Sequence, residues 1–252
     1  MKSSLSYRSL GCVFFALLLC LADTVHAQEA DAFARANQEF AAGRFGEALD
    51  LYNGLVNRGE MSTALFYNIG NTWYRSGDLG QAILNYERAL VLEPHHPEAE
   101  ANLRLVRDKA RALELRQNPV ERAVGRGTSA QYAIAVAVSF WVAAFALAGW
   151  LLARRRSSTL VAILSLSVLL LAGCGYALYL LETGANGGAL AIVTAKTTEA
   201  RLATADNAGT VLALPPGSEI KILSTRGDWS YAALPNNLRG WIPAKNAQRV
   251  RM

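Results

Sequence analysis

Residues 68–94 read NIGNTWYRSGDLGQAILNYERALVLEP, and small, aromatic and proline residues recur in this stretch at fixed intervals. In a unit of about 34 residues, Gly70 takes position 8, and the residues that follow in register are Trp73, Gly77, Ala82, Tyr86, Ala89 and Pro94. Small side chains let two antiparallel helices approach closely, and a proline ends the second helix. The stretch therefore predicts a tightly packed helical hairpin.

The same spacing recurs one unit earlier, where GRFGEALDLY (43–52) parallels GDLGQAILNY (77–86). This periodicity is typical of tetratricopeptide repeats (TPRs). We therefore expect an α-helical TPR domain over 28–118. It would contain repeats at about 29–62 and 63–96 and a capping helix at 97–116, which would cover the last apolar face of the array.

The chain starts with Lys2, Arg8 and an uncharged apolar stretch, GCVFFALLLCLA at 11–22, which a short segment ending in VHA follows. A basic start, a short apolar run and small residues at the end are typical of a secretory signal peptide. We expect this peptide over 1–27, and an uncleaved membrane anchor is the open alternative. Either would export the domain that follows.

Two further stretches, 127–153 and 157–181, carry no charged side chain. Each is longer than the roughly 20 residues that cross a bilayer. Arginines between two spans favour a cytoplasmic turn, so both soluble domains are expected in the periplasm of an inner-membrane protein. The expected parts are a basic juxtamembrane linker at 119–129, transmembrane helices at 130–153 and 159–181, a cytoplasmic turn at 154–158 and a linker at 182–188.

The chain has a net charge of +5. Many of its basic residues lie just before the first span, and these are Arg107, Lys109, Arg111, Arg116, Arg122 and Arg126. We interpret them as solvated side chains that face lipid headgroups. The lipid bilayer is then the partner of this segment, and the exported location excludes nucleic acid.

Residues 189–252 change in composition to short β-prone segments separated by turn residues, which predicts a small all-β module. LPPGSEIKIL (214–223), GDWSYAAL (227–234) and GWIPAKNAQRV (240–250) resemble the bacterial SH3 domain, and this resemblance implies a small SH3-like barrel. Trp229, Tyr231 and Trp241 form its candidate ligand face. Packing in the core is the open alternative for these aromatics.

The sequence offers no catalytic, metal-binding or cofactor-binding pattern. His95 and His96 lie in the turn EPHHPE without a third ligand at a spacing suited to metal, and no phosphate-binding loop or nucleophile motif is present. We therefore expect a protein that is not an enzyme and takes no cofactor.

Four asparagines provide the candidate peptide-binding groove instead. Asn37 and Asn71 are separated by one repeat, as are Asn68 and Asn102, and the two positions lie three residues apart on one helix face. An amide side chain offers both a donor and an acceptor to a peptide backbone. Packing between repeats is the alternative role for these residues.

The order of the parts is a signal peptide, about two TPRs, a two-span hairpin and a C-terminal bacterial SH3 domain. This order, and residues 64–115 in particular, resembles the BatE family of the aerotolerance operon. The resemblance implies an inner-membrane scaffold in a Bat-type aerotolerance or envelope-stress complex. The partners that it implies are von Willebrand A-domain membrane proteins, a BatD-like protein and, indirectly, a MoxR-type ATPase.

Two functions remain open from the sequence. One is a non-catalytic adaptor that binds protein partners in the periplasm through its TPR groove. The other is an envelope sensor whose SH3 domain binds peptidoglycan peptides. The expected fold is thus a multi-domain membrane protein with a TPR domain, a transmembrane helical hairpin and a small all-β barrel.

Overall fold

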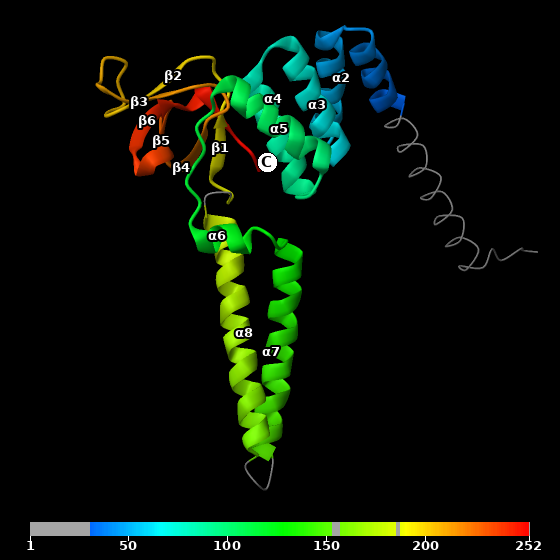
Figure 1. Ribbon diagram of the computed structural model, residues 1–252, viewed down its shortest axis with the longest axis vertical. Coiled ribbons are helices and arrows are strands. Elements are labelled where there is room, and N and C mark those ends of the chain that lie inside the picture. The colour runs from blue at the N-terminus through cyan, green and yellow to red at the C-terminus, as the bar shows by residue number, and fades with distance from the viewer. Residues whose placement is uncertain (1–30, 153–156, 185–186, 252) are drawn as a thin grey trace, which may run out of the picture.

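The computed structural model describes residues 31–152, 157–184 and 187–251. The predicted signal peptide at 1–27 and most of the predicted turn at 154–158 lie outside these residues. Figure 1 shows a helical array and an antiparallel sheet side by side, with a long helical hairpin extending from them in one direction.

The helical array begins with a helix at 31–41 and continues through four helices: α2 (Phe45–Asn57), α3 (Thr63–Ser76), α4 (Leu79–Leu92) and α5 (Pro97–Ala110). Its turns follow from local chemistry. Gly77 adopts a left-handed conformation with φ of 85° and ends α3, and the Asp78 side chain then accepts from the Gln81 N–H to begin α4. Left-handed backbone favours glycine, and aspartate is a preferred N-cap.

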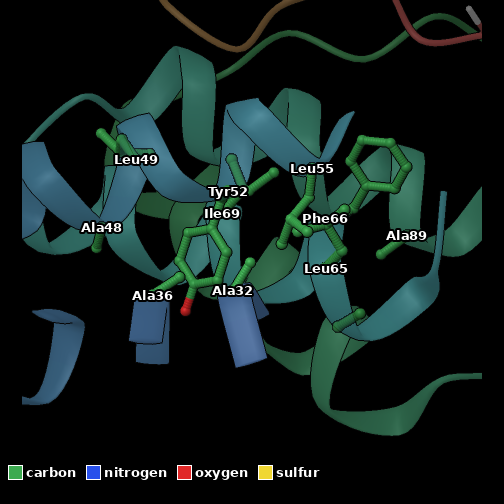
Figure 2. Packing of buried hydrophobic residues seen from close by; sticks show 11 residues of the cluster. Ala32, Ala36, Ala48, Leu49, Tyr52, Leu55, Leu65, Phe66, Ile69 and Ala89 are labelled. Carbon is green, nitrogen blue, oxygen red and sulfur yellow. The ribbon is translucent and has the colours of Figure 1, made fainter. Parts of the chain in front are cut away.

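The array has the close packing that the repeat pattern predicts. A β-carbon added at Gly70 would lie 2.7 Å from the Tyr86 ring, so α3 and α4 meet there at a distance that only glycine allows. Ala82 is fully buried beside this contact. Figure 2 shows the core between the first and second repeats, where Tyr52 of α2 and Phe66 and Ile69 of α3 pack among small alanine side chains.

The capping helix is shorter than the sequence predicts. It ends at Ala110 rather than at 116, because Arg111 adopts a left-handed conformation with φ of 52°. Residues 111–118, here called the strap, then run along the sheet. The Leu113 N–H donates to Ser218 Oγ at 3.1 Å, and the Glu219 N–H donates to the Leu113 carbonyl at 2.8 Å. Peptide groups that would have continued the helix are therefore bonded to the sheet instead.

After the short helix α6 (Pro119–Val124), the chain forms the hairpin of α7 (Ser129–Leu152) and α8 (Ser158–Thr183). Both helices are long and apolar enough to cross a membrane. Their large apolar side chains face outward, among them Trp141, Phe145 and Leu169, which are 60%, 71% and 70% exposed. A surface of this kind is unfavourable in water over such an area, which supports membrane association.

The C-terminal module is one antiparallel sheet of seven strands in the order β3-β2-β6-β5-β4-β1-β7. The strands are β1 (Leu190–Val193), β2 (Thr198–Arg201), β3 (Thr210–Leu214), β4 (Glu219–Arg226), β5 (Trp229–Ala233), β6 (Arg239–Pro243) and β7 (Ala247–Arg249). The all-β prediction is confirmed at this level. Within the described residues β3 and β7 are edge strands that do not pair with each other, so the sheet is not closed as a barrel.

Replacing Ala82 by Leu should destabilise the array, since the larger side chain has no space between α3 and α4. Overpacking of this kind costs about 1–3 kcal/mol. We expect a lower melting temperature for the full chain in detergent micelles, measured by circular dichroism. Ala101→Leu, at an exposed position of α5, should melt like the wild type. Equal melting of the two variants would contradict the packing described here.

Candidate functional site

The four predicted asparagines lie together and form a repeating hydrogen-bond unit. Asn37 Oδ1 accepts from the Tyr52 hydroxyl at 2.6 Å and from Asn68 Nδ2 at 2.9 Å. One repeat later, Asn71 Oδ1 accepts from the Tyr86 hydroxyl at 2.7 Å and from Asn102 Nδ2 at 3.0 Å. The same three residue types thus repeat the same bonds, and the asparagines link neighbouring repeats.

Each asparagine uses only one of its two polar atoms in this ladder. Asn37 and Asn71 accept through oxygen, which leaves their Nδ2 donors free of protein partners in the described part of the chain. Asn68 and Asn102 donate through nitrogen, which leaves their oxygens free in the same way. None of these free atoms is among the buried polar atoms without a partner, so they reach solvent. Their order along the face is donor, acceptor, donor, acceptor.

The tyrosines that support the ladder are held in their neutral, donating form. Burial raises the pKa of the Tyr52 hydroxyl to about 12 and raises the pKa of the Tyr86 hydroxyl further. Both hydroxyls therefore keep their protons at neutral pH, and the two asparagine oxygens remain occupied. The free ends of the asparagines are fixed in direction by these bonds.

Aromatic side chains flank the ladder with the same period. On the first helix, Phe33 and Phe40 lie four residues before and three residues after Asn37. On α3, Tyr67 and Tyr74 have the same spacing from Asn71. On each helix the two aromatics therefore lie on or next to the face that carries the asparagine. The Lys109 ammonium lies 4.8 Å from the centre of the Tyr74 ring. We call the four asparagines and these four aromatics the asparagine face.

The second predicted site, Trp229, Tyr231 and Trp241, lies on the sheet. Tyr231 and Trp241 are directly opposite each other on β5 and β6, and their ring centres are 5.0 Å apart. All three side chains are half-buried and lie outside the hydrophobic core of the sheet, which alternate β5 residues such as Ala232 enter. The structure therefore places them on the outer face.

The sheet packs directly against the helical array, which sequence reasoning did not predict. Leu190, Ile192 and Val250 join Ile83 of α4 and Leu103 and Val106 of α5 in one buried apolar cluster. Gly217 has a φ of 84°, and a side chain added there would collide with Ile83. The two soluble parts are thus one packed unit rather than modules joined only through the hairpin (Figure 1).

A buried ionic cluster lies at this interface. The Arg107 guanidinium of α5 pairs with Glu87 of α4 and with Glu219 of β4, and the three side chains are only 15%, 15% and 8% exposed. The Leu115 N–H of the strap donates to the second oxygen of Glu219 at 2.9 Å. The interpretation of Arg107 as a residue that faces lipid headgroups is therefore wrong, because its guanidinium is buried and forms ion pairs between the array and the sheet.

The cluster has two buried carboxylates for one guanidinium, so its full ionisation would bury an excess negative charge. Burial raises the pKa of Glu87, and it raises the pKa of Glu219 to about 7, although Arg107 opposes both shifts. The packed arrangement therefore favours one bound proton near neutral pH. The sequence signal for the cluster was weak, since Arg107 stands in a run of basic residues and its partners are distant in the chain.

The structure gives no candidate metal centre within its described residues, where no three metal-ligating side chains come together. His96 instead begins α5, because its Nδ1 accepts from the Ala99 N–H at 3.2 Å. This is the N-cap role of a turn residue.

In comparisons with known proteins, residues 63–96 match the tetratricopeptide repeat family. These residues coincide with the bounds predicted for the second repeat, and the match supports a tetratricopeptide repeat there. No curated protein shows a significant match to the chain. Tetratricopeptide repeats are generally non-catalytic scaffolds, so the match indicates binding to other proteins.

The stability of the packed unit should fall as the pH rises from about 5 to about 8. Folded Glu219 keeps its proton up to about pH 7, whereas an unfolded glutamate loses it near pH 4.5, so a rise in pH favours the unfolded chain. Glu219→Gln mimics the neutral glutamic acid at every pH. The free energy of unfolding of this variant should therefore fall less over the same pH range, by on the order of 3 kcal/mol. Denaturant unfolding of the full chain in micelles measures it.

The matched control is Glu93→Gln, at an exposed carboxylate without an ion pair in the described part of the chain. It should keep the wild-type pH dependence. If Glu219→Gln also keeps it, Glu219 is ionised in the packed unit and the proton assignment is wrong.

Proposed function

We propose that this protein is a non-catalytic membrane adaptor that binds an extended segment of partner proteins on its asparagine face. The observation that carries the proposal is the alternation of free amide donors and acceptors along that face. A peptide backbone alternates N–H and C=O groups, so free ends at Asn37, Asn68, Asn71 and Asn102 can bind it without a particular side-chain sequence.

Specificity would come from the flanking rows. Phe33, Phe40, Tyr67 and Tyr74 pack partly against the core, and the part of each ring that stays exposed beside the ladder suits apolar or aromatic side chains of a bound segment. The bonds to Tyr52 and Tyr86 hold the asparagine side chains in one orientation before a ligand binds. Side chains that are already ordered lose less conformational entropy on binding, so they bind more tightly. The match to a tetratricopeptide repeat over 63–96 supports this use of the array.

We further propose that the chain spans a membrane twice and that its soluble parts lie in the periplasm. The apolar α7–α8 hairpin supports a membrane protein with two spans, and arginines between the spans favour a cytoplasmic turn and periplasmic soluble domains. The resemblance of the chain to the BatE family supports a place in a Bat-type aerotolerance or envelope-stress complex. Its partners would be von Willebrand A-domain and BatD-like membrane proteins, and indirectly a MoxR-type ATPase.

A second function, binding of peptidoglycan peptides by an SH3-like C-terminal module, is favoured by one observation. Trp229, Tyr231 and Trp241 lie outside the core of the sheet, and Tyr231 and Trp241 pack against each other on its outer face. Such a surface can stack against a ligand. Tyr231→Ala would weaken binding to purified peptidoglycan if this function holds, whereas changes on the asparagine face would leave that binding intact.

Asn71→Asp should weaken peptide binding by about tenfold or more without destabilising the array. Aspartate keeps an oxygen for Tyr86 and Asn102 but replaces the free donor by an acceptor, which would oppose a peptide carbonyl; an unmet buried polar group costs about 1–3 kcal/mol. Peptides selected from a random decapeptide library on the full chain in micelles provide the ligand. Their dissociation constants are then measured for both proteins.

Asn71→Ala is the matched control for the internal role. It removes the acceptor of the Tyr86 hydroxyl and should therefore lower the melting temperature, which Asn71→Asp should not do. Unchanged peptide affinity in Asn71→Asp would place the binding surface elsewhere and leave the asparagines with a packing role alone.

The proposed topology predicts which positions an impermeant maleimide reaches in intact spheroplasts. In a chain with its own cysteines replaced by serine, single cysteines at Asp108 and Arg226, both exposed, should be labelled. A cysteine at Ser158 should be labelled only after the membrane is permeabilised. The reverse pattern would invert the topology and exclude a periplasmic adaptor.

A further inference from the structure

A cavity of about 1100 Å³ lies between the helical array and the end of the hairpin that faces it. The last turn of α4 and the side of α5 that carries Leu103, Arg104 and Arg107 form one wall, and residues 114–117 of the strap form another. Residues 127–130, at and just before the start of α7, and Leu181 near the end of α8 complete the lining. In Figure 1, the helices of the array lie above the end of the hairpin at which α6, α7 and α8 meet.

The cavity has an excess of positive charge. Arg104, Arg116 and Arg122 line it, are exposed, and have no acidic partner within the described residues. Of the carboxylates that line it, Glu87, Glu219 and Glu114 are all near Arg107, and Glu100 is the remaining one. A fourth arginine of the lining, Arg251, pairs with Glu182 at 3.2 Å. Three free guanidinium groups therefore face one free carboxylate.

Apolar side chains lie in the same cavity. Val91 and Leu92, at the end of α4, are 41% and 45% exposed, and Leu90, Pro94 and Leu115 add to this surface. A soluble anion could pair with the arginines but would leave these side chains in water. An amphiphile satisfies both parts of the lining.

The position of the cavity indicates which amphiphile. It lies at the ends of two helices that are apolar enough to cross a bilayer, at the level where lipid headgroups would surround the hairpin. The first turn of α7 also lines it, and the N-terminal end of a long helix carries partial positive charge. Phosphate is the anionic group that arginines and helix N-termini both favour.

We infer that this cavity binds the headgroup of an anionic phospholipid, with its phosphate between Arg104, Arg116 and Arg122. The upper part of the lipid would contact Val91 and Leu92, and its acyl chains would continue along the hairpin. The inference rests on the proposed membrane span of α7 and α8. It adds to the adaptor function, because a bound lipid would fix the array above the membrane surface.

The test uses the full chain in dodecyl maltoside micelles, titrated with short-chain phosphatidylglycerol or with zwitterionic phosphatidylcholine. Native mass spectrometry counts the bound lipids. Phosphatidylglycerol should bind at least about tenfold more tightly, and Arg104→Gln/Arg122→Gln should remove about tenfold or more of this affinity, since each arginine near a lipid surface contributes appreciably. Equal binding of the two lipids by the wild type would overturn the inference.

Arg226→Gln/Arg239→Gln is the matched control, because it removes the same charge from exposed positions of the sheet outside the cavity lining. The control variant should bind phosphatidylglycerol with the wild-type affinity. If both double variants lose the same affinity, the effect comes from net charge alone and the proposed site is wrong. Melting temperatures without lipid verify folding. If Arg104→Gln/Arg122→Gln unfolds, Arg122→Gln alone decides, since Arg122 is exposed and outside the array.

Two further measurements are needed. One distinguishes a lipid phosphate from a soluble phosphate, and the other distinguishes lipid binding from peptide binding on the asparagine face. Competition by glycerol phosphate at the concentration of the lipid would make a soluble phosphate the ligand and contradict the lipid assignment. Asn71→Asp, which should weaken peptide binding, should leave lipid binding unchanged. Failure of lipid selectivity with intact peptide binding therefore affects this inference alone, and the maleimide labelling reports separately on the membrane span.

Discussion

The guanidinium of Arg107 lies between a carboxylate of the helical array and a carboxylate of the sheet, Glu87 and Glu219, and all three groups are largely removed from water. Breaking a buried pair of this kind costs several kcal/mol, because the partner left behind is charged and unsolvated. The strap depends on the same groups, since the Leu115 N–H bonds to Glu219. The relative position of the array, the strap and the sheet therefore follows from this one cluster and the apolar contacts around it.

The parts of the fold that the sequence predicts well are those fixed by local periodicity. The spacing of Gly70, Ala82 and Tyr86 specifies how α3 and α4 approach, and the structure has this contact at the predicted place. The turn between these helices follows from Gly77 and Asp78 alone. The apolar hairpin is equally visible, because its composition is uniform over each helix.

The parts that could not be predicted depend on residues far apart in the chain. Nothing near Arg107 in the sequence distinguishes it from Arg104, which is three residues earlier and exposed. Its partners Glu87 and Glu219 stand in different domains of the predicted architecture. The asparagines were identified from their period, but their bonds to Tyr52 and Tyr86 required the structure. One polar atom of each asparagine bonds within the array, and the other has no protein partner among the described residues.

Gly217, in the turn between β3 and β4, approaches Ile83 of α4 so closely that no side chain fits between them. The sheet thereby occupies the apolar end of the array, where repeat proteins usually add a further unit by duplication. A new helix pair at that end would displace the sheet and expose Leu190 and Ile192. Additional repeats would therefore have to lie beside the first repeat, at the end of the array that carries Asn37.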